Sequence, residues 1–203
     1  MSILASRCRK NHSVPVVTAV TWNPLDKNPN VTLSNFNLDA NVGGATFYAV
    51  RSNTSRSTGK FYFEIEKLGS STNQTIIGIA TSAADLTLTI GRDVYGWGLQ
   101  SDYPPGGYSY HNNVGGLIAS LNGISCAQNG RAMFAVDFVT GKIWMGMLGT
   151  FDGNPAAGTG ATYTFTPNTQ LFIAGSTNSS IRIHAGGDAF TYPIPAGFSA
   201  WQS

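Results

Sequence analysis

Charged residues are scarce in this chain of 203 residues, in which Lys, Arg, Asp and Glu together make up only 11%. A typical soluble domain carries about a quarter charged residues, so most of this polar surface must come from Ser, Thr, Asn and Gly. The net charge of +2 is too small to attract nucleic acid through bulk electrostatics. We therefore expect no nucleic-acid partner.

Cysteine and metal-ligand patterns are nearly absent as well. The two cysteines, Cys8 and Cys126, do not make a disulfide framework, and we expect two free thiols without deciding whether either pairs elsewhere. No C-x-x-C or His/Cys spacing suggests zinc. The sequence thus predicts no metal site and no cofactor.

Long hydrophobic runs are also missing, and none reaches the length of a membrane-spanning helix. The N-terminus does not read as a secretory signal, because the apolar run at residues 3–5 is short and Arg7, Arg9 and Lys10 follow it. We expect no membrane insertion and folding in a cytoplasm.

The clearest positive signal is the stretch of residues 58–66, which alternates between apolar and polar side chains. Phe61, Phe63 and Ile65 fall on one face of an extended chain, and Tyr62 falls on the other face with the two glutamates. Aromatic and β-branched residues favour strands. This segment is therefore predicted to be a strand with one buried face.

About ten or eleven short strands with turn signals between them are predicted along the chain, and no internal repeat and no βαβ alternation appear. Residues 53–59 are expected to form a polar turn. The clearest hairpin joins residues 132–138 to 143–147. This pattern predicts an all-β sandwich or barrel over residues 21–203. Its predicted core includes Phe61, Phe63, Ile65, Ile77, Trp97 and Trp144.

Four segments resemble the motifs of SPRY domains in the same order. These are Gly-Lys-Phe-Tyr-Phe-Glu at residues 59–64, Ile-Gly-Ile-Ala at 77–80, the Asp…Gly-Lys-Ile-Trp-Met-Gly hairpin at 137–146, and Ile-Pro-Ala-Gly-Phe at 194–198. The resemblance implies a two-sheet antiparallel β-sandwich of the concanavalin-like jelly-roll type. It also implies a scaffold that recognises partners through its loops and carries no common catalytic residues.

The low charge and the Gly/Thr/Asn-rich composition look more like the SPRY-like modules of tailed-phage virion proteins. That resemblance implies a non-enzymatic bacteriophage structural protein, located in the virion after synthesis in the host cytoplasm. A tail, fibre or capsid-decorating component would be a homo-oligomer or a multi-copy part of the particle. The alternative is a free-standing, lectin-like domain that binds glycans.

A catalytic site is not expected. A sugar hydrolase needs two carboxyl groups that flank a cleft, and Glu64 and Glu66, the only glutamates, share one strand face. However, the hydrolases on this type of sandwich carry a Glu-x-Asp-x-Glu run that is missing here, and the adjacent Lys67 is expected to neutralise Glu66. His12, His111 and His184 are scattered, and no serine or cysteine has a nucleophile motif.

The best binding candidates follow the aromatic segment of residues 95–111, since flat rings stack on sugars and anchor protein partners. We expect the side chains beside the Pro-Pro-Gly-Gly turn to be exposed and to bind a partner. A second candidate is the loop of residues 151–155. Either a host-surface glycan or a protein could be the partner. The predicted binding residues are Tyr103, Tyr108, Tyr110, His111, Asp152 and Asn154.

Residues 1–20 differ in composition from the rest and are predicted to be an attachment arm. Its basic residues Arg7, Arg9 and Lys10 could meet carboxylates of another virion protein. The extended segment at residues 14–17 could add a strand to that protein's sheet edge.

Overall fold

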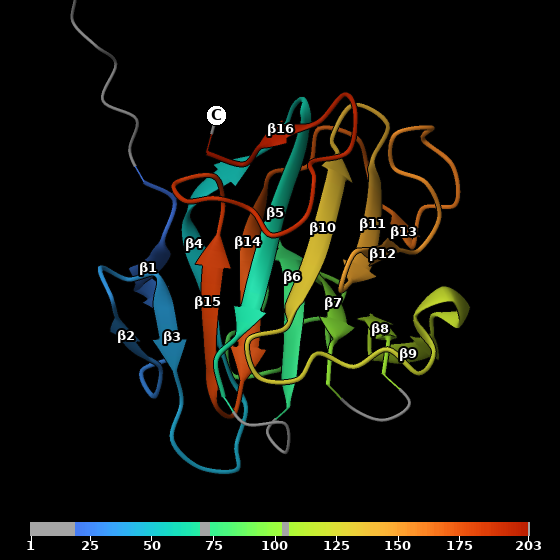
Figure 1. Ribbon diagram of the computed structural model, residues 1–203. Coiled ribbons are helices and arrows are strands. Elements are labelled where there is room, and N and C mark those ends of the chain that lie inside the picture. The colour runs from blue at the N-terminus through green and yellow to red at the C-terminus, as the bar shows by residue number, and fades with distance from the viewer. Residues whose placement is uncertain (1–18, 70–73, 103–105, 203) are drawn as a thin grey trace, which may run out of the picture.

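The computed structural model describes residues 19–69, 74–102 and 106–202. Two sheets lie face to face, which confirms the predicted two-sheet β-sandwich (Figure 1). The seven-stranded sheet runs through β1 (Trp22–Lys27), β4 (Tyr48–Arg56), β14 (Leu171–Thr177), β6 (Thr75–Ala80), β7 (Gly96–Gln100), β8 (Tyr108–His111) and β9 (Val114–Leu117).

The nine-stranded sheet faces the viewer in Figure 1. It runs through β12 (Thr150–Phe151), β11 (Lys142–Met147), β10 (Arg131–Asp137), β5 (Lys60–Lys67), β15 (Ser180–His184), β3 (Asp39–Asn41) and β2 (Thr32–Ser34), with β13 (Tyr163–Thr164) beside β11 and β16 (Ser199–Ala200) beside β5. The pairing of β16 with β5 is parallel, and the other pairings are antiparallel. One short 3-10 helix, η1 (Ala119–Leu121), is the helical element of the described residues.

The core lies between the sheets and is centred on the strand that the alternation predicted. Phe63 and Ile65 are fully buried, and Ile77 reaches them from the opposite sheet. The ring of Phe63 stacks on Phe134 at 4.8 Å between centroids and meets Trp201 edge-on at 5.3 Å. Apolar burial on both sheets thus holds the sandwich together.

Trp144 is buried, but its predicted place in this core is wrong. It points away from the opposite sheet, because its neighbours Ile143 and Met145 on β11 occupy the core face. Its indole nitrogen donates to the carbonyl of Thr159 at 2.8 Å, and its ring meets Phe198 edge-on. Trp144 therefore fixes an outer loop to the sheet.

The predicted polar turn at residues 53–59 is shorter than expected, because β4 continues to Arg56. Arg56 and Ser55 pair with Leu171 and Phe172 of β14, so backbone pairing overrides the polar composition of this segment. Strands β1, β3, β9, β12 and β16 were not predicted, and they are very short, polar or glycine-rich. They lack the alternation by which strands are recognised.

The C-terminal segment crosses the outer face of the nine-stranded sheet, in front of β5 and β10 in Figure 1. It ends in β16, which pairs with β5, and in Trp201, whose fully buried ring reaches the core. The described residues also include Val20, which is 3% exposed and belongs to the core. A truncation that spares the core should therefore stop at residue 18.

The described part of the chain contains no helix with the length and apolar character needed to span a membrane.

Candidate functional site

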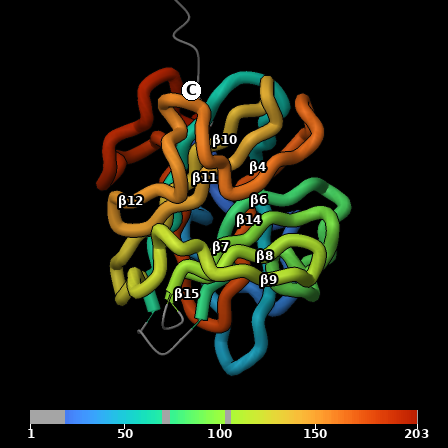
Figure 2. Tube along the Cα trace, turned by 90° about the vertical axis from the view of Figure 1, so that its right-hand side faces the viewer, coloured from blue at the N-terminus to red at the C-terminus, as the bar shows by residue number. Residues whose placement is uncertain are grey.

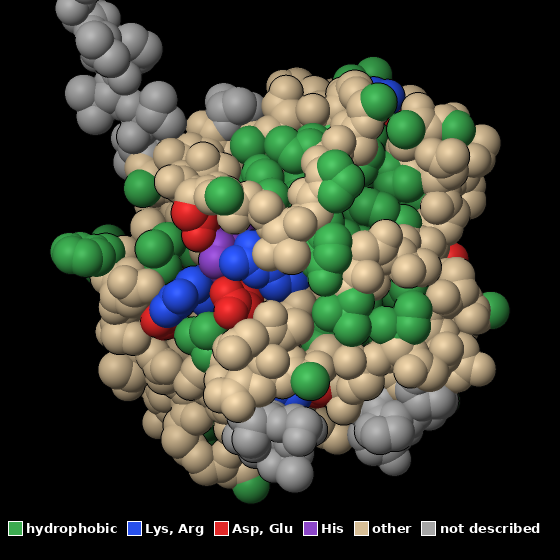
Figure 3. Space-filling model, in the orientation of Figure 1, with side chains coloured by type: hydrophobic (Ala, Val, Ile, Leu, Met, Phe, Trp, Pro, Cys, Tyr) green, Lys and Arg blue, Asp and Glu red, His purple; other side chains and the backbone are tan. Residues whose placement is uncertain are grey.

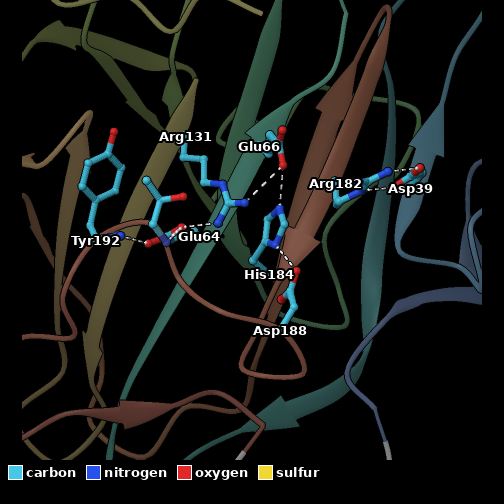
Figure 4. Close-up of polar contacts among 9 residues, drawn as sticks. Asp39, Glu64, Glu66, Arg131, Arg182, His184, Asp188 and Tyr192 are labelled. Atoms are coloured by element: carbon cyan, nitrogen blue, oxygen red, sulfur yellow. Dashed lines mark hydrogen bonds and ion pairs between the residues drawn. The ribbon is translucent and has the colours of Figure 1, made fainter. Parts of the chain in front are cut away.

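Two polar regions on the outer faces of the sandwich are candidate functional sites. The first, which we call the charge network, lies on the outer face of the nine-stranded sheet and is the cluster of coloured side chains left of centre in Figure 3. It consists of Asp39, Glu64, Glu66, Arg131, Arg182, His184 and Asp188 (Figure 4). In a chain with few charges, such a concentration needs an explanation.

Glu64 is the buried centre of this network. Its carboxylate is inaccessible to solvent and accepts four hydrogen bonds, from Tyr62 Oη at 2.7 Å, Tyr192 N at 2.8 Å, Arg131 Nη1 at 2.8 Å and Thr191 N at 3.0 Å. Burial and this bonded carboxylate raise the pKa of the Tyr62 hydroxyl far above its usual value. Glu64 therefore anchors the C-terminal segment to the sheet.

Glu66 and His184 extend the network towards β15. The Glu66 carboxylate lies 2.8 Å from His184 Nε2 and 3.4 Å from Arg131, while His184 Nδ1 lies 2.6 Å from Asp188 (Figure 4). The side chain of His184 is only 3% exposed. Its two ring nitrogens both face carboxylates, so neither is directed at an open cleft.

The expected neutralisation of Glu66 by Lys67 does not occur. Successive side chains of a strand point to opposite faces, so Lys67 points into the sandwich while Glu66 points out. Arg131 pairs with Glu66 instead, His184 Nε2 lies 2.8 Å from the same carboxylate, and Arg182 forms a two-point ion pair with Asp39. The charge network is thus a set of cross-strand pairs that stabilise the sheet and its cover.

Replacing Glu64 by Gln should lower the free energy of unfolding by about 1.5–3 kcal/mol, which is typical of hydrogen bonds to a charged group. The glutamine amide nitrogen would face backbone N–H donors of Thr191 and Tyr192, and Arg131 would lose its carboxylate. Urea unfolding measures the loss, and Asp188→Asn is the control because that side chain is 50% exposed. Equal losses in the two variants would contradict the anchoring role.

The second region is a groove on the outer face of the seven-stranded sheet. Two hollows of about 440 and 460 Å³ share Phe47, Thr89 and Arg92 and together form this groove. Pockets of this size suit small-molecule and oligomeric ligands. The remaining lining residues are Thr46, Gln74, Ile76, Thr87, Leu88, Gln100, Tyr108, Tyr110 and Asn113.

Tyr108 and Tyr110 come from β8, which lies between β7 and β9 at one end of the seven-stranded sheet (Figure 2). Being two residues apart, they share the outer face of the strand, opposite Gln100 and Gly98 of β7. The Tyr110 hydroxyl donates to Gln100 Oε1 at 2.9 Å. Both rings are half-buried, so each presents part of its surface to the groove.

A loop of residues 81–95 forms the other wall of the groove. It lies directly on the sheet, because Gly98 has no side chain and a Cβ there would come within 2.5 Å of the Ile90 carbonyl oxygen. The loop thereby presents Thr89 and Arg92. The Thr89 hydroxyl is buried without a hydrogen-bond partner among the described residues, and Arg92 is exposed with Nη1 donating to Asn113 at 2.9 Å.

The structure brings two of the predicted binding residues, Tyr108 and Tyr110, into the groove. Tyr103 lies outside the described residues. The expected exposure of His111 is corrected. It alternates with the tyrosines to the inner face, where its ring stacks on Trp97 at 4.7 Å and Nδ1 contacts the Gly96 carbonyl at 2.8 Å. Trp97 belongs to the core, as predicted.

The loop candidates Asp152 and Asn154 lie away from the groove. Asp152 accepts a hydrogen bond from Ser120, and the Asn154 side chain accepts from the backbone of Ala157 within its own loop. Asn154 also borders a separate hollow of about 330 Å³ beside Tyr192. Their side-chain oxygens thus hold loops in place, and a binding role for these two residues stays a prediction.

Sequence reasoning missed Arg92, Gln100 and Phe47, which complete the groove. A lone arginine or glutamine gives no pattern, and Phe47 is far from the other two in sequence. Among the described residues, no group of three His, Cys, Asp or Glu side chains could hold a metal ion. The groove therefore presents aromatic rings, side-chain amides and one guanidinium.

No family model matches the sequence, and no curated protein does so either. The SPRY domain of human HERC1 superimposes with a TM-score of 0.64 at 12% identity, covering 83% of this chain and 99% of that one. The TRIM65 PSpry domain gives 0.58 at 18% identity, covering 81% and 90% of the two chains. Stonustoxin gives 0.55 at 15% identity, covering 81% of this chain and 26% of the toxin.

At these identities the likeness bears on the fold. The chain has the SPRY-type, concanavalin-like sandwich that the four sequence motifs predicted. Function must be argued from the site, because one fold hosts many activities.

Proposed function

We propose that this protein is a non-enzymatic recognition module that binds its partner in the groove on the seven-stranded sheet. The observation that carries the proposal is the convergence of Tyr108 and Tyr110 with Arg92 and Gln100 around one open hollow. Half-exposed aromatic rings with a few polar groups are typical of binding sites. The SPRY-type fold supports an interaction role by analogy.

The two glutamates favour binding over hydrolysis. Glu64 has both oxygens engaged by four donors, and Glu66 is paired with Arg131 and His184. General acid–base catalysis needs a carboxyl group that can reach a substrate and exchange a proton with it. We therefore expect no sugar release from capsule or cell-wall polysaccharide, and Glu64→Gln should leave ligand binding by the folded protein unchanged.

For the setting, we propose a multi-copy component of a tailed-phage virion, attached to other virion proteins through the N-terminal arm. Support comes from the composition and from the sequence resemblance to SPRY-like phage modules. The arm, with Arg7, Arg9 and Lys10, lies outside the described residues, and the packed core begins at Val20. Attachment and recognition would then lie in separate parts of the chain.

Two variants test whether attachment and recognition lie in separate parts of the chain. Deleting residues 1–18 should leave a folded sandwich that no longer joins the particle, as measured by mass spectrometry of purified particles. Tyr108→Ala should join the particle at normal occupancy but reduce its binding to host cells. Phe36→Ala is the control, because this aromatic residue is 92% exposed and lies outside the groove.

Full incorporation of the truncated protein would contradict the attachment role of the arm. Absence of the full-length protein from purified particles would contradict the virion setting. Unchanged cell binding by particles that carry Tyr108→Ala together with Arg92→Gln would contradict recognition through the groove.

A further inference from the structure

We propose that the ligand of the groove is an acidic glycan, whose acid group pairs with Arg92 while its sugar rings stack on Tyr108 and Tyr110. This inference rests on the proposed binding function and names the chemical class of its ligand. The acid group is a carboxylate or a phosphate, since a guanidinium binds either one with two hydrogen bonds.

The charge of the groove selects an anion. Arg92 is the one charged residue that lines either hollow, and no Asp or Glu lines them among the described residues. Other arginines are occupied: Arg51, Arg131 and Arg182 each pair with a carboxylate. Among the described residues, Arg92 instead forms no ion pair. It donates to the Asn113 side chain, which orients its guanidinium without compensating its charge.

The neutral polar groups of the groove suit sugar hydroxyls. The Thr89 side chain lines both hollows, and its hydroxyl has no hydrogen-bond partner among the described residues. Gln100 accepts from Tyr110 through Oε1, so its amide nitrogen is left to donate to the groove, and Gln74 adds a second amide. Hydroxyls both donate and accept, so they match this mixed set.

The position of the groove on the sheet argues against an extended peptide. Peptides that bind to sheets are held chiefly by main-chain hydrogen bonds at a free strand edge. The groove instead crosses the face of β6, β7 and β8, whose ladder hydrogen bonds are already formed. Recognition there must use side chains. The rings of Phe47, Tyr108 and Tyr110 offer flat apolar surface, which suits the faces of sugar rings.

Isothermal titration calorimetry of the full chain tests the inference. The probes are an oligogalacturonate, its carboxyl-reduced neutral counterpart, a phosphate-bearing teichoic acid fragment and poly-L-glutamate. We expect binding of the oligogalacturonate or the teichoic acid fragment, and which of them binds identifies the acid group. The neutral counterpart should bind at least about tenfold more weakly, because a charge-assisted pair is worth on the order of one such factor.

Variants locate the binding. Arg92→Gln and Tyr108→Ala should each weaken it about tenfold or more, while Lys27→Gln, which removes one positive charge outside the groove, should not. Equal binding of the neutral oligosaccharide, binding of poly-L-glutamate alone, or no binding of any probe would overturn the acidic-glycan inference. If Tyr108→Ala still impairs cell binding, each of these outcomes contradicts the acidic-glycan ligand but not recognition through the groove. The two proposals can therefore be refuted separately.

Discussion

Replacing Lys67 by Met should lower the free energy of unfolding by about 3–5 kcal/mol, the typical cost of breaking a buried ion pair on one side. Lys67 Nζ lies 2.7 Å from Asp102 Oδ2, and both side chains are only 1% exposed. Lys67 belongs to β5 and Asp102 follows β7, so the pair joins the two sheets. Without the ammonium group, Asp102 would be a buried and largely uncompensated charge. Urea unfolding measures the loss.

The double variant Lys67→Met with Asp102→Leu is the matched control. It removes both charges, and apolar replacements of buried ion pairs are often neutral or stabilising. Asp102 Oδ1 already lacks a hydrogen-bond partner among the described residues, so little bonding is lost. The double variant should recover most of the stability. If the double variant instead loses as much free energy of unfolding as the two single variants together, the account in terms of an uncompensated buried charge is contradicted.

The pH dependence provides a second check on this pair. Burial raises the pKa of Asp102, although Lys67 acts in the opposite direction. A carboxyl group whose folded pKa is raised stabilises the protein below its unfolded pKa and loses that contribution as pH rises through the folded pKa. In Lys67→Met, the lysine no longer opposes the effect of burial on the pKa of Asp102. The loss in free energy of unfolding relative to the unsubstituted protein should therefore be smaller near pH 4 than near pH 7. A deficit that grows on acidification would contradict this account.

Cys126 offers a local readout of the same region. Its backbone nitrogen donates to Ser101 at 2.6 Å, and burial beside Asp102 raises the pKa of its thiol to about 12. Thiolate is the reactive form, so Cys126 should resist alkylation in the native protein. In a Cys8→Ser background, Lys67→Met should accelerate its alkylation, because opening around the pair exposes the thiol. Faster alkylation than in Phe63→Ala, which is expected to lose similar stability, would show local loosening beyond the global loss of stability.

Replacing Phe63 by Ala should also cost about 3–5 kcal/mol, through lost burial and the cavity left behind. Phe63 is inaccessible to solvent and contacts the rings of Phe134 and Trp201. Trp201 is also packed against Phe61 and Phe138, so the cavity would open at the joint between β5, β10 and the C-terminal segment. Denaturant unfolding gives the loss directly.

Phe36→Ala is the matched control for this substitution, because the same side chain is removed from a position that is 92% exposed. Its free energy of unfolding should change by less than about 0.5 kcal/mol. Similar losses in both variants would mean that the sandwich does not depend on the Phe63 cluster. A small loss at Phe63 alone would contradict the burial assigned to it.

Strand alternation determines which face of its sheet each candidate side chain occupies. The parity that places Tyr108 and Tyr110 on one face of β8 necessarily places His111 on the other face, where it stacks on Trp97. The same parity sends Lys67 inward with Phe63 and Ile65, away from Glu66. The expectations that His111 is exposed beside the tyrosines and that Lys67 neutralises Glu66 were wrong for this reason, since neighbouring side chains in a strand point to opposite faces.

The sequence by itself determined the fold class and the central strand. Alternating aromatic residues around Phe63 and the hairpin of residues 132–138 and 143–147 predict sheets, because a period of two can bury only one face. Tertiary structure alone decided the pairing of Lys67 with Asp102, which are 35 positions apart, and the joining of Arg92 and Gln100 to the tyrosines. Such contacts depend on which strands become neighbours. The order of strands in each sheet is set by packing of the whole chain and cannot be predicted from local sequence patterns.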